Sequence, residues 1–324
     1  MYPTSEEGRA SREIYFSYRP SFLPQKLLRE IFMLKFTKIF SYRIFIGALI
    51  VSIVSALNIQ SAPASTKFPK RIISLSPSAT ETLFAIGAGD QVIAVDDLSN
   101  FPSSAPLTKL SAFSPNVEAL MNYKPDLIVL NADATKATEV KAALEKLKIK
   151  VFLERAPKDL SQAYSEVTAL GRATGNLPGA QSVVANMKTK IRAAIAKGRK
   201  SAKITFFHEL DNTLYTATSD TFIGKVYRDF NLVNVADPAA TADSAGYPQL
   251  QSEYLIKANP KVIFLSDAQY GESLATLQKR PGWNGIAAVK SKNIVALPED
   301  IPSRWGPRLI EFYEFIADSI AKIK

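Results

Sequence analysis

Two stretches of the chain, VEALMNYKPDLIVLNADA at residues 117–134 and SEYLIKANPKVIFLSDAQ at residues 252–269, align with each other without a gap. Each begins with a short helical segment that carries a Glu, continues through a Pro, and ends in an apolar strand followed by polar residues. A helix–strand unit that recurs at the matching place in each half of a chain is typical of two similar lobes. The repeat therefore predicts a two-lobed α/β protein.

The segments around the first copy alternate between short apolar strands and amphipathic helices. Strands are expected at residues 71–76, 92–96, 127–130 and 151–153, and helices at residues 78–86, 116–122, 138–147 and 160–174. After Gly198 the alternation resumes at residues 204–208, 221–230, 249–258 and 262–266, and an amphipathic helix closes the chain at residues 307–323. Because strands separated by helices pair in parallel, each half is expected to hold a helix-covered parallel sheet.

One long helix is expected between the halves. Residues 180–197 place five apolar side chains on one face, namely Val183, Val184, Met187, Ile191 and Ile195. At 1.5 Å per residue this helix spans roughly 27 Å, about the width of a small domain. The predicted fold class is α/β, with two Rossmann-like lobes at residues 66–178 and 201–324 joined by one spanning helix at residues 179–200. Ligands bind such sheets at the carboxyl ends of the strands, so a ligand cleft is expected between the lobes.

The N-terminal part of the chain has the pattern of a secretory signal. Residues 33–65 contain Lys35, Lys38 and Arg43, then a 14-residue, largely apolar segment at 44–57, then small residues at 62–64 suited to cleavage. A membrane-spanning helix usually needs about 20 apolar residues, so export is the first interpretation and an uncleaved anchor is the alternative. Residues 1–32 precede Met33 and are interpreted as a disordered extension or a mis-assigned start. The mature protein is expected outside the cytoplasm.

The composition excludes several kinds of chemistry. The 324 residues include no Cys and one His, His208, which rules out disulfides, thiolate metal sites and multi-histidine metal sites. The formal charge is +10, but much of it lies near the N-terminus and the rest is interleaved on helix faces. No basic stripe with stacking aromatic residues is present, so we expect no nucleic-acid partner.

Four motifs follow one another along residues 71–323. They are RIISLSPSATETLFAIGAGDQVIAVDD, NVEALMNYKPDLIVL, GYPQLQSEYLIKANPKVIFL and SRWGPRLIE. With these motifs, and over about 250 residues, the chain resembles the helix-hinged periplasmic solute-binding proteins of ABC importers for vitamin B12, ferric siderophores and haem. The resemblance implies a non-enzymatic, monomeric binding protein with no cofactor of its own. Its partners would be a small-molecule chelate and the membrane subunits of an ABC permease.

The resemblance also assigns two residues to permease docking. In this family one Glu per lobe docks on arginines of the permease, and the motifs place these at Glu118 and Glu253. The two residues occupy the same position in the two copies of the repeat. Paired charges suit a pseudo-symmetric partner and set its orientation. The alternative is that both are ordinary solvated helix charges.

Cleft loops offer aromatic walls for a large planar ligand. The candidates are Phe101, Phe113, Tyr247 and Trp305, with Arg304 as a cation beside Trp305. The resemblance places Tyr247 where the B12 binder has a wall tryptophan, and Phe113 one residue away from a second. Asn131 and Leu98 stand where that binder has other aromatic residues, a departure that counts against cobalamin. Domain-core packing is the alternative for each aromatic residue.

Two polar residues complete the expected site. Ser78 and Glu81 are read as an S-x-x-E capping box after Pro77, whose helix start either receives an anionic group of the ligand or is only a cap. His208 ends the strand at residues 204–208 and either contacts the ligand or is a packed residue. Metal coordination by this single His is the less favoured interpretation, so no metal site is predicted.

The expected function is capture of cobalamin or a related metal chelate for an ABC importer, with a ferric siderophore or haem as the alternative ligand. Arg304 and Lys109 are the main cations near the expected cleft, which favours a near-neutral corrinoid over an anionic siderophore. An enzyme is disfavoured because the sequence has no G-x-S-x-G elbow, no phosphate-binding Gly-rich loop and no second His. A tethered protein that has lost its ligand is the third interpretation.

Overall fold

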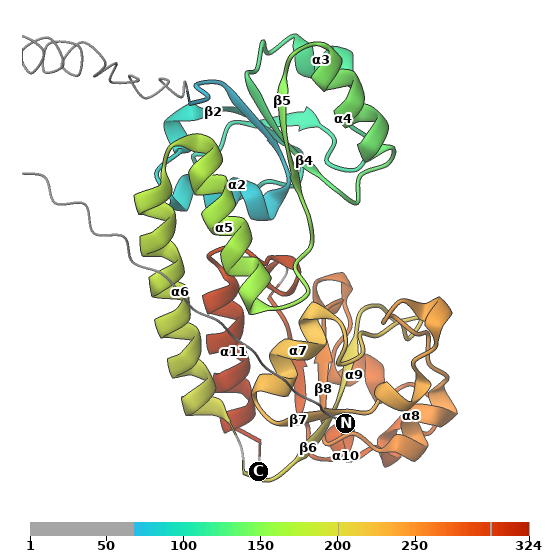
Figure 1. The fold of residues 1–324 in the computed structure, drawn as a ribbon. Coiled ribbons are helices and arrows are strands. Elements are labelled where there is room, and N and C mark those ends of the chain that lie inside the picture. The colour runs from blue at the N-terminus through green and yellow to red at the C-terminus, as the bar shows by residue number, and fades with distance from the viewer. Residues whose placement is uncertain (1–67, 200, 299, 324) are drawn as a thin grey trace, which may run out of the picture. The chain divides into compact units, whose positions relative to one another are not determined.

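The computed structural model describes residues 68–199, 201–298 and 300–323. The expected extension and signal at residues 1–65 lie outside the described residues. Within the described part, two parallel sheets form two lobes, and one long helix runs between them (Figure 1). The predicted α/β class, with two lobes of parallel sheet and a spanning helix, is confirmed.

The N-lobe sheet has five parallel strands in the order β3-β2-β1-β4-β5. They are β1 (Ile72–Leu75), β2 (Val92–Asp96), β3 (Leu107–Leu110), β4 (Leu127–Asn131) and β5 (Lys150–Glu154). The central strand β1 reads IISL and is buried along its whole length, as is usual for a parallel strand covered on both faces. The covering helices are α2 (Pro77–Ala85), α3 (Val117–Met121), α4 (Ala137–Lys146) and α5 (Leu160–Thr174).

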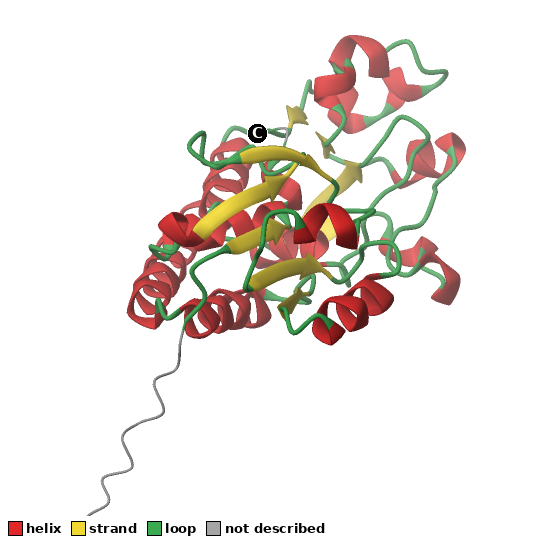
Figure 2. Ribbon diagram, turned by 90° about the horizontal axis from the view of Figure 1, so that it is seen from above, coloured by secondary structure: helices red, strands yellow, loops and turns green. Residues whose placement is uncertain are grey.

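The C-lobe sheet has four parallel strands in the order β7-β6-β8-β9. They are β6 (Ile204–Glu209), β7 (Leu232–Asn234), β8 (Val262–Leu265) and β9 (Ile294–Ala296). Its longer helices are α7 (Phe222–Asp229), α8 (Ser252–Ala258) and α11 (Leu309–Ala321). Two one-turn helices, α9 (Leu274–Leu277) and α10 (Ala287–Lys290), lie between α8 and α11 in the sequence. Figure 2 shows parallel strands with helices beside them.

Helix α6 (Leu177–Gly198) joins the two sheets. Met187 and Ile191 on its inner face are buried in one apolar cluster that extends from β1 in the N-lobe to β8 in the C-lobe. Helices α5 and α11 pack along α6, and Gly198 allows this approach because a Cβ there would lie 2.7 Å from the Ala317 Cα. The spanning helix is therefore part of the core rather than an isolated linker.

The sequence repeat is a repeat of structure. Helices α3 and α8 begin at the first residue of each copy, and strands β4 and β8 both begin ten residues later. Lys124 and Asn259 occupy equivalent positions and both adopt the left-handed backbone region, with φ of 50° and 48°. Glu118 and Glu253 are each the second residue of their helix. The two lobes thus share one αβ unit in the same register.

Three edge strands escape the sequence analysis, and one cap is corrected. Two of the four residues of β3 are exposed, β7 and β9 have three residues each, and none of the three strands has a long apolar run. The N-cap of α2 is Ser76, whose hydroxyl accepts from the Ala79 N–H. Ser78 therefore lies in the first turn, and the predicted Ser78–Glu81 capping box is wrong. Among the described residues, no helix has both the length and the hydropathy to span a bilayer.

Candidate ligand-binding cleft

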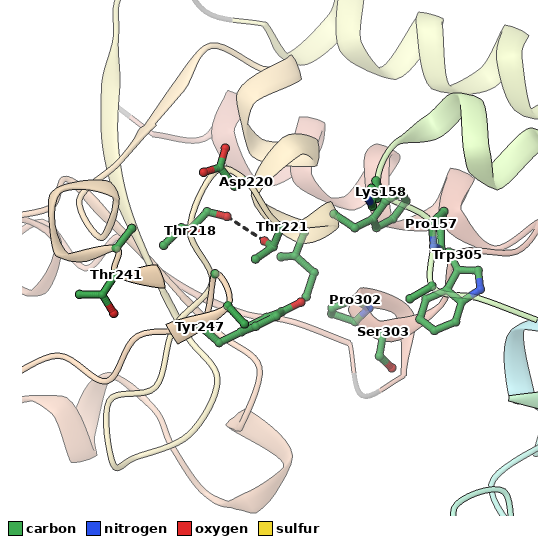
Figure 3. Close-up of a pocket in the computed structure, with 16 residues that line it drawn as sticks. Pro157, Lys158, Thr218, Asp220, Thr221, Thr241, Tyr247, Pro302, Ser303 and Trp305 are labelled. Atoms are coloured by element: carbon green, nitrogen blue, oxygen red, sulfur yellow. Dashed lines mark hydrogen bonds between the residues drawn. The ribbon is translucent and has the colours of Figure 1, made fainter. Parts of the chain in front are cut away.

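A cavity of about 470 Å³ lies where the two lobes meet. Its walls come from loops that follow the carboxyl ends of four strands, as expected for open parallel sheets. The lining residues are Ala156, Pro157 and Lys158 after β5, Thr218 and Asp220 to Ile223 after β6, Ala240, Thr241 and Ala245 to Tyr247 after β7, and Pro302, Ser303 and Trp305 after β9. Figure 3 shows Tyr247 and Thr241 on one side of the cavity and Trp305 beside Pro157 on the other.

Tyr247 is presented by two loop segments that pair with each other. The Thr218 N–H donates to the Gly246 carbonyl at 2.9 Å, the Thr216 N–H donates to the Pro248 carbonyl at 3.1 Å, and Tyr215 bridges Gln249. This short ladder leaves Tyr247 at the cavity with 43% of the residue exposed. Burial of part of the ring, and to a lesser extent the charge of Asp133, raise the pKa of Tyr247. The tyrosine therefore meets a ligand as a neutral phenol.

Trp305 belongs to residues 300–308, which we call the strap. The strap follows β9 of the C-lobe, yet it is held by the N-lobe (Figure 1). The backbone N–H of Trp305 donates to the Ser78 Oγ at 3.3 Å, and the side-chain amide of Asn100 donates to the Asp300 carboxylate at 2.7 Å. At Gly306 the backbone is so close to α2 that a Cβ would lie 2.9 Å from the Ser78 carbonyl.

The guanidinium groups of Arg304 and Arg308 fasten the strap to a buried carboxylate. Glu81 is 3% exposed and lies 3.5 Å from the Arg304 Nε and 3.2 Å from the Arg308 Nη1. Burial raises the pKa of Glu81 to about 7, and the charges of Arg308 and then Arg304 oppose this rise. Arg304 also pairs with Asp300 at 3.0 Å and is only 9% exposed. The expectation that Arg304 faces the ligand is thus corrected, because its charge is used inside the protein.

The cavity itself is nearly neutral. Among its lining residues, Lys158 and Asp220 carry the charges, one of each sign. The other polar side chains of the wall carry hydroxyls, namely Thr218, Thr221, Thr241, Ser303 and Tyr247. Lys109, the other expected cation, lines a separate cavity beside α3. Such a wall suits a ligand with hydrogen-bonding groups and little net charge.

His208 does not reach the cleft. Its side chain is fully buried, with Nδ1 2.8 Å from the Tyr227 Oη and Nε2 3.1 Å from the Ser266 Oγ. The expectation of a ligand contact is corrected in favour of the packed alternative. In the described residues no group of three or more His, Cys, Asp and Glu side chains is placed to hold a metal ion.

The buried imidazole leads to a pH prediction. Burial lowers the pKa of His208 to about 3. The unfolded chain takes up a proton below about pH 6.5 and the folded protein does not, so this group favours unfolding as the pH falls from 6.5 towards 3. Because the chain has one His, NMR of its labelled imidazole should show a neutral ring with no titration between pH 8 and pH 5. A midpoint near 6.5 would show that the ring is exposed to solvent.

The remaining predicted site residues do not line the cavity. Phe101 is 43% exposed, and its ring lies 4.5 Å from the Arg308 guanidinium carbon. Phe113 is 57% exposed on the loop after β3, and its carbonyl accepts from the Thr135 N–H. Ser78 is buried beneath the strap. The structure thus brings Tyr247 and Trp305 together at the cavity and leaves these three outside its wall.

Glu118 and Glu253 are both exposed at the starts of α3 and α8. Neither forms an ion pair with another residue in the described part of the chain. Their carboxylates lie in the first turn of a helix, where negative charge is favoured by the helix dipole. Both groups are therefore available to a partner molecule.

Sequence reasoning missed Pro157, Lys158, Thr218 and Thr241, because small and polar loop residues carry no motif. It also missed Glu154, the last residue of β5, which is 2% exposed and accepts from the Trp305 Nε1 at 2.8 Å. The one signal for them was position, since each of these residues ends or follows a strand. A rule that every loop after a strand faces the cleft would have found the residues of the cavity wall, but it would not have shown which of them matter most for binding.

Comparison with known proteins agrees with this architecture. The periplasmic binding protein family model matches residues 72–301. An uncharacterised ABC transporter substrate-binding lipoprotein of Bacillus subtilis, YvrC, is 32% identical over 263 residues, which cover 78% of this chain and 81% of the relative. A vitamin B12-binding protein of Vibrio vulnificus is 28% identical over 276 residues, covering 83% and 94%.

A solved structure from Staphylococcus epidermidis, described as a possible iron-binding periplasmic solute-binding protein, is similar with a TM-score of 0.69 and 28% identity. The match covers 79% of this chain and all of the other. The chain belongs to the periplasmic binding protein family. It is a substrate-binding protein of an ABC transporter and not an enzyme, and its partners are a small ligand and a permease.

Proposed function

We propose that the protein captures cobalamin or a closely related corrinoid and delivers it to its ABC permease. The cavity between the lobes carries the proposal, because its wall includes the aromatic side chains of Tyr247, Trp305 and Phe222, and one cation there balances one anion. A corrin ring needs apolar and aromatic faces, and its amide side chains need hydrogen-bonding groups such as the exposed Thr241 and Ser303 hydroxyls of this wall. The likeness to the Vibrio vulnificus B12-binding protein supports the same choice.

The charge of the cavity separates this ligand from the alternative. Haem carries carboxylates and many ferric siderophores are anionic, so both are best received by several Arg or Lys side chains. In the cavity wall Lys158 is the one such residue, and Asp220 offsets it. A ferric siderophore or haem remains the second candidate, favoured by the iron-binding description of the Staphylococcus epidermidis structure.

The proposal includes a docking surface and a location. Glu118 and Glu253 would place one carboxylate of each lobe against basic residues of the two permease subunits, as their shared position in the repeat and their exposure support. The signal pattern at residues 33–65, which lies outside the described residues, would direct the protein across the membrane. We expect the mature protein to act there as a monomer.

The test is a ligand panel. The purified protein is titrated with cyanocobalamin, haemin and a ferric siderophore by calorimetry, with thermal unfolding measured in parallel. A ligand at 100 times its Kd adds about 2.7 kcal/mol to the free energy of unfolding, which raises the Tm by roughly 5–10 °C. Saturable binding of cyanocobalamin at micromolar or tighter Kd supports the proposal. Saturation by haemin or the siderophore alone would replace the ligand and keep the transport role.

A further inference from the structure

The side chain of Glu154 links the N-lobe sheet to the cleft tryptophan. Glu154 ends β5, and its own carbonyl accepts from the Ala132 N–H at 2.8 Å, so its backbone is fixed at the sheet edge. Its Oε1 accepts from the Trp305 Nε1 at 2.8 Å, across 151 residues of sequence. The cavity wall begins two residues further along, at Ala156. One carboxylate therefore connects a rigid strand to an indole that lines the cavity.

Glu154 is not buried as one half of an ion pair. The charged groups that act on it are Glu166 and Asp133, which have the same sign, and no cation pairs with it among the described residues. Burial, with these two carboxylates as smaller causes, raises the pKa of Glu154 to about 7, while hydrogen bonds from Ser76 and Trp305 oppose the rise. A buried carboxyl group without a cation costs stability. The polar contact that this carboxylate makes with the cleft is the one to Trp305.

The indole needs this acceptor to keep one orientation. The backbone of Trp305 is held by Ser78 on α2, and the neighbouring Gly306 lies against the same residue. These contacts act on the backbone, whereas the hydrogen bond of the side chain is the one to Glu154. A half-buried indole whose N–H has lost its partner turns to place that N–H in water. The single hydrogen bond to Glu154 thus selects which face of the ring is presented to the cavity.

We propose that Glu154 is the positioning residue that holds the Trp305 indole against the ligand, so that ligand affinity depends on an acceptor at position 154. The proposal rests on the proposed function for its ligand, but the position of the indole exists without one. Glu154→Gln keeps an acceptor oxygen and removes the charge. Glu154→Leu keeps a similar volume and removes the acceptor. The two variants therefore separate hydrogen bonding from both charge and packing.

The first measurement is made on the ligand-free protein. The chain has two Trp residues, so protein labelled with 5-fluorotryptophan should give two fluorine resonances. Trp283 is fully buried and donates to Ser252, which makes its resonance an internal control of folding. In Glu154→Leu the Trp305 resonance should move toward the solvent-exposed position while the Trp283 resonance stays. In Glu154→Gln both should remain. An unmoved Trp305 resonance in Glu154→Leu would overturn the proposal.

The second measurement is affinity in a double-mutant cycle with Trp305→Phe, which keeps an aromatic ring and removes the N–H. Titrated with cyanocobalamin, Glu154→Leu should lose about 10-fold in Kd and Glu154→Gln less than 3-fold. Adding Glu154→Leu to Trp305→Phe should cost no more than 2-fold further. Equal losses in the Gln and Leu variants, or fully additive losses in the cycle, would overturn the proposal. If wild type binds no member of the panel, the ligand assignment fails, and the fluorine spectra still decide the positioning role.

Discussion

The combined variant Tyr247→Ala, Trp305→Ala is expected to bind its ligand at least 100-fold more weakly than wild type. These two side chains lie on opposite sides of the cavity, Tyr247 on a loop of the C-lobe and Trp305 on the strap that is held by the N-lobe. The third aromatic residue of the wall, Phe222, belongs to α7. A well-packed aromatic contact of this kind contributes about 1.5 kcal/mol or more, and 1.4 kcal/mol corresponds to a factor of ten in Kd. Calorimetric titration with the ligand identified by the panel measures the loss.

The matched control is Tyr270→Ala. Tyr270 is 82% exposed and does not line the cavity, so its removal should change Kd by less than 2-fold. Each single variant should lose about 10-fold, with a Tm within a few degrees of wild type because neither ring is in the core. If the double variant binds within 3-fold of wild type while folded, the cleft between the lobes is not the ligand site.

Reversing both exposed glutamates is expected to stop transport without affecting capture. In Glu118→Lys, Glu253→Lys, uptake or permease ATPase activity stimulated by the loaded protein should fall at least 50-fold, while the Kd for the ligand stays within 2-fold. Like charges placed opposite each other at an interface cost several kcal/mol, and the two sites act on the same complex. Reconstituted permease in proteoliposomes, with the binding protein added outside, gives both quantities.

A second pair of substitutions controls for the change in net charge. Glu139 and Glu314 are exposed helix residues, on α4 and α11, and Glu139→Lys, Glu314→Lys makes the same change in net charge. This pair should leave transport within 2-fold of wild type. Comparable losses in both double variants would point to net charge, and undiminished transport in Glu118→Lys, Glu253→Lys would remove the docking proposal.

The fold could be predicted because its signals are local and repeated. The helix–strand register of residues 117–131 and 252–265 follows from the shared Glu, the shared Pro and the apolar runs, all of which the sequence displays. Strands β3, β7 and β9 could not be predicted because they lack such local signals. Short edge strands take their structure from a neighbouring strand rather than from their own residues.

The site could be predicted only in part because burial of polar groups depends on distant residues. Tyr247 and Trp305 stand beside Gly and Pro and were placed in loops at the cleft, where the structure has them. Arg304 looks the same in the sequence, yet Glu81, more than 200 residues earlier, takes its charge out of the cleft. Likewise nothing beside His208 in the sequence shows that Tyr227 and Ser266 enclose it.

The strap has a consequence for the degrees of freedom of the lobes. Helix α6 contacts the N-lobe at the end of α2, where a Cβ on Gly179 would lie 2.1 Å from the Ile86 carbonyl. The strap contacts the N-lobe at the start of the same helix, at Ser78. These two attachments are about 12 Å apart along one rigid helix. A body attached at one point rotates about three axes, whereas one attached at two points keeps rotation about the line between them. We expect these attachments to restrict twisting between the lobes, so that binding changes the separation of Glu118 and Glu253 by a small rocking motion.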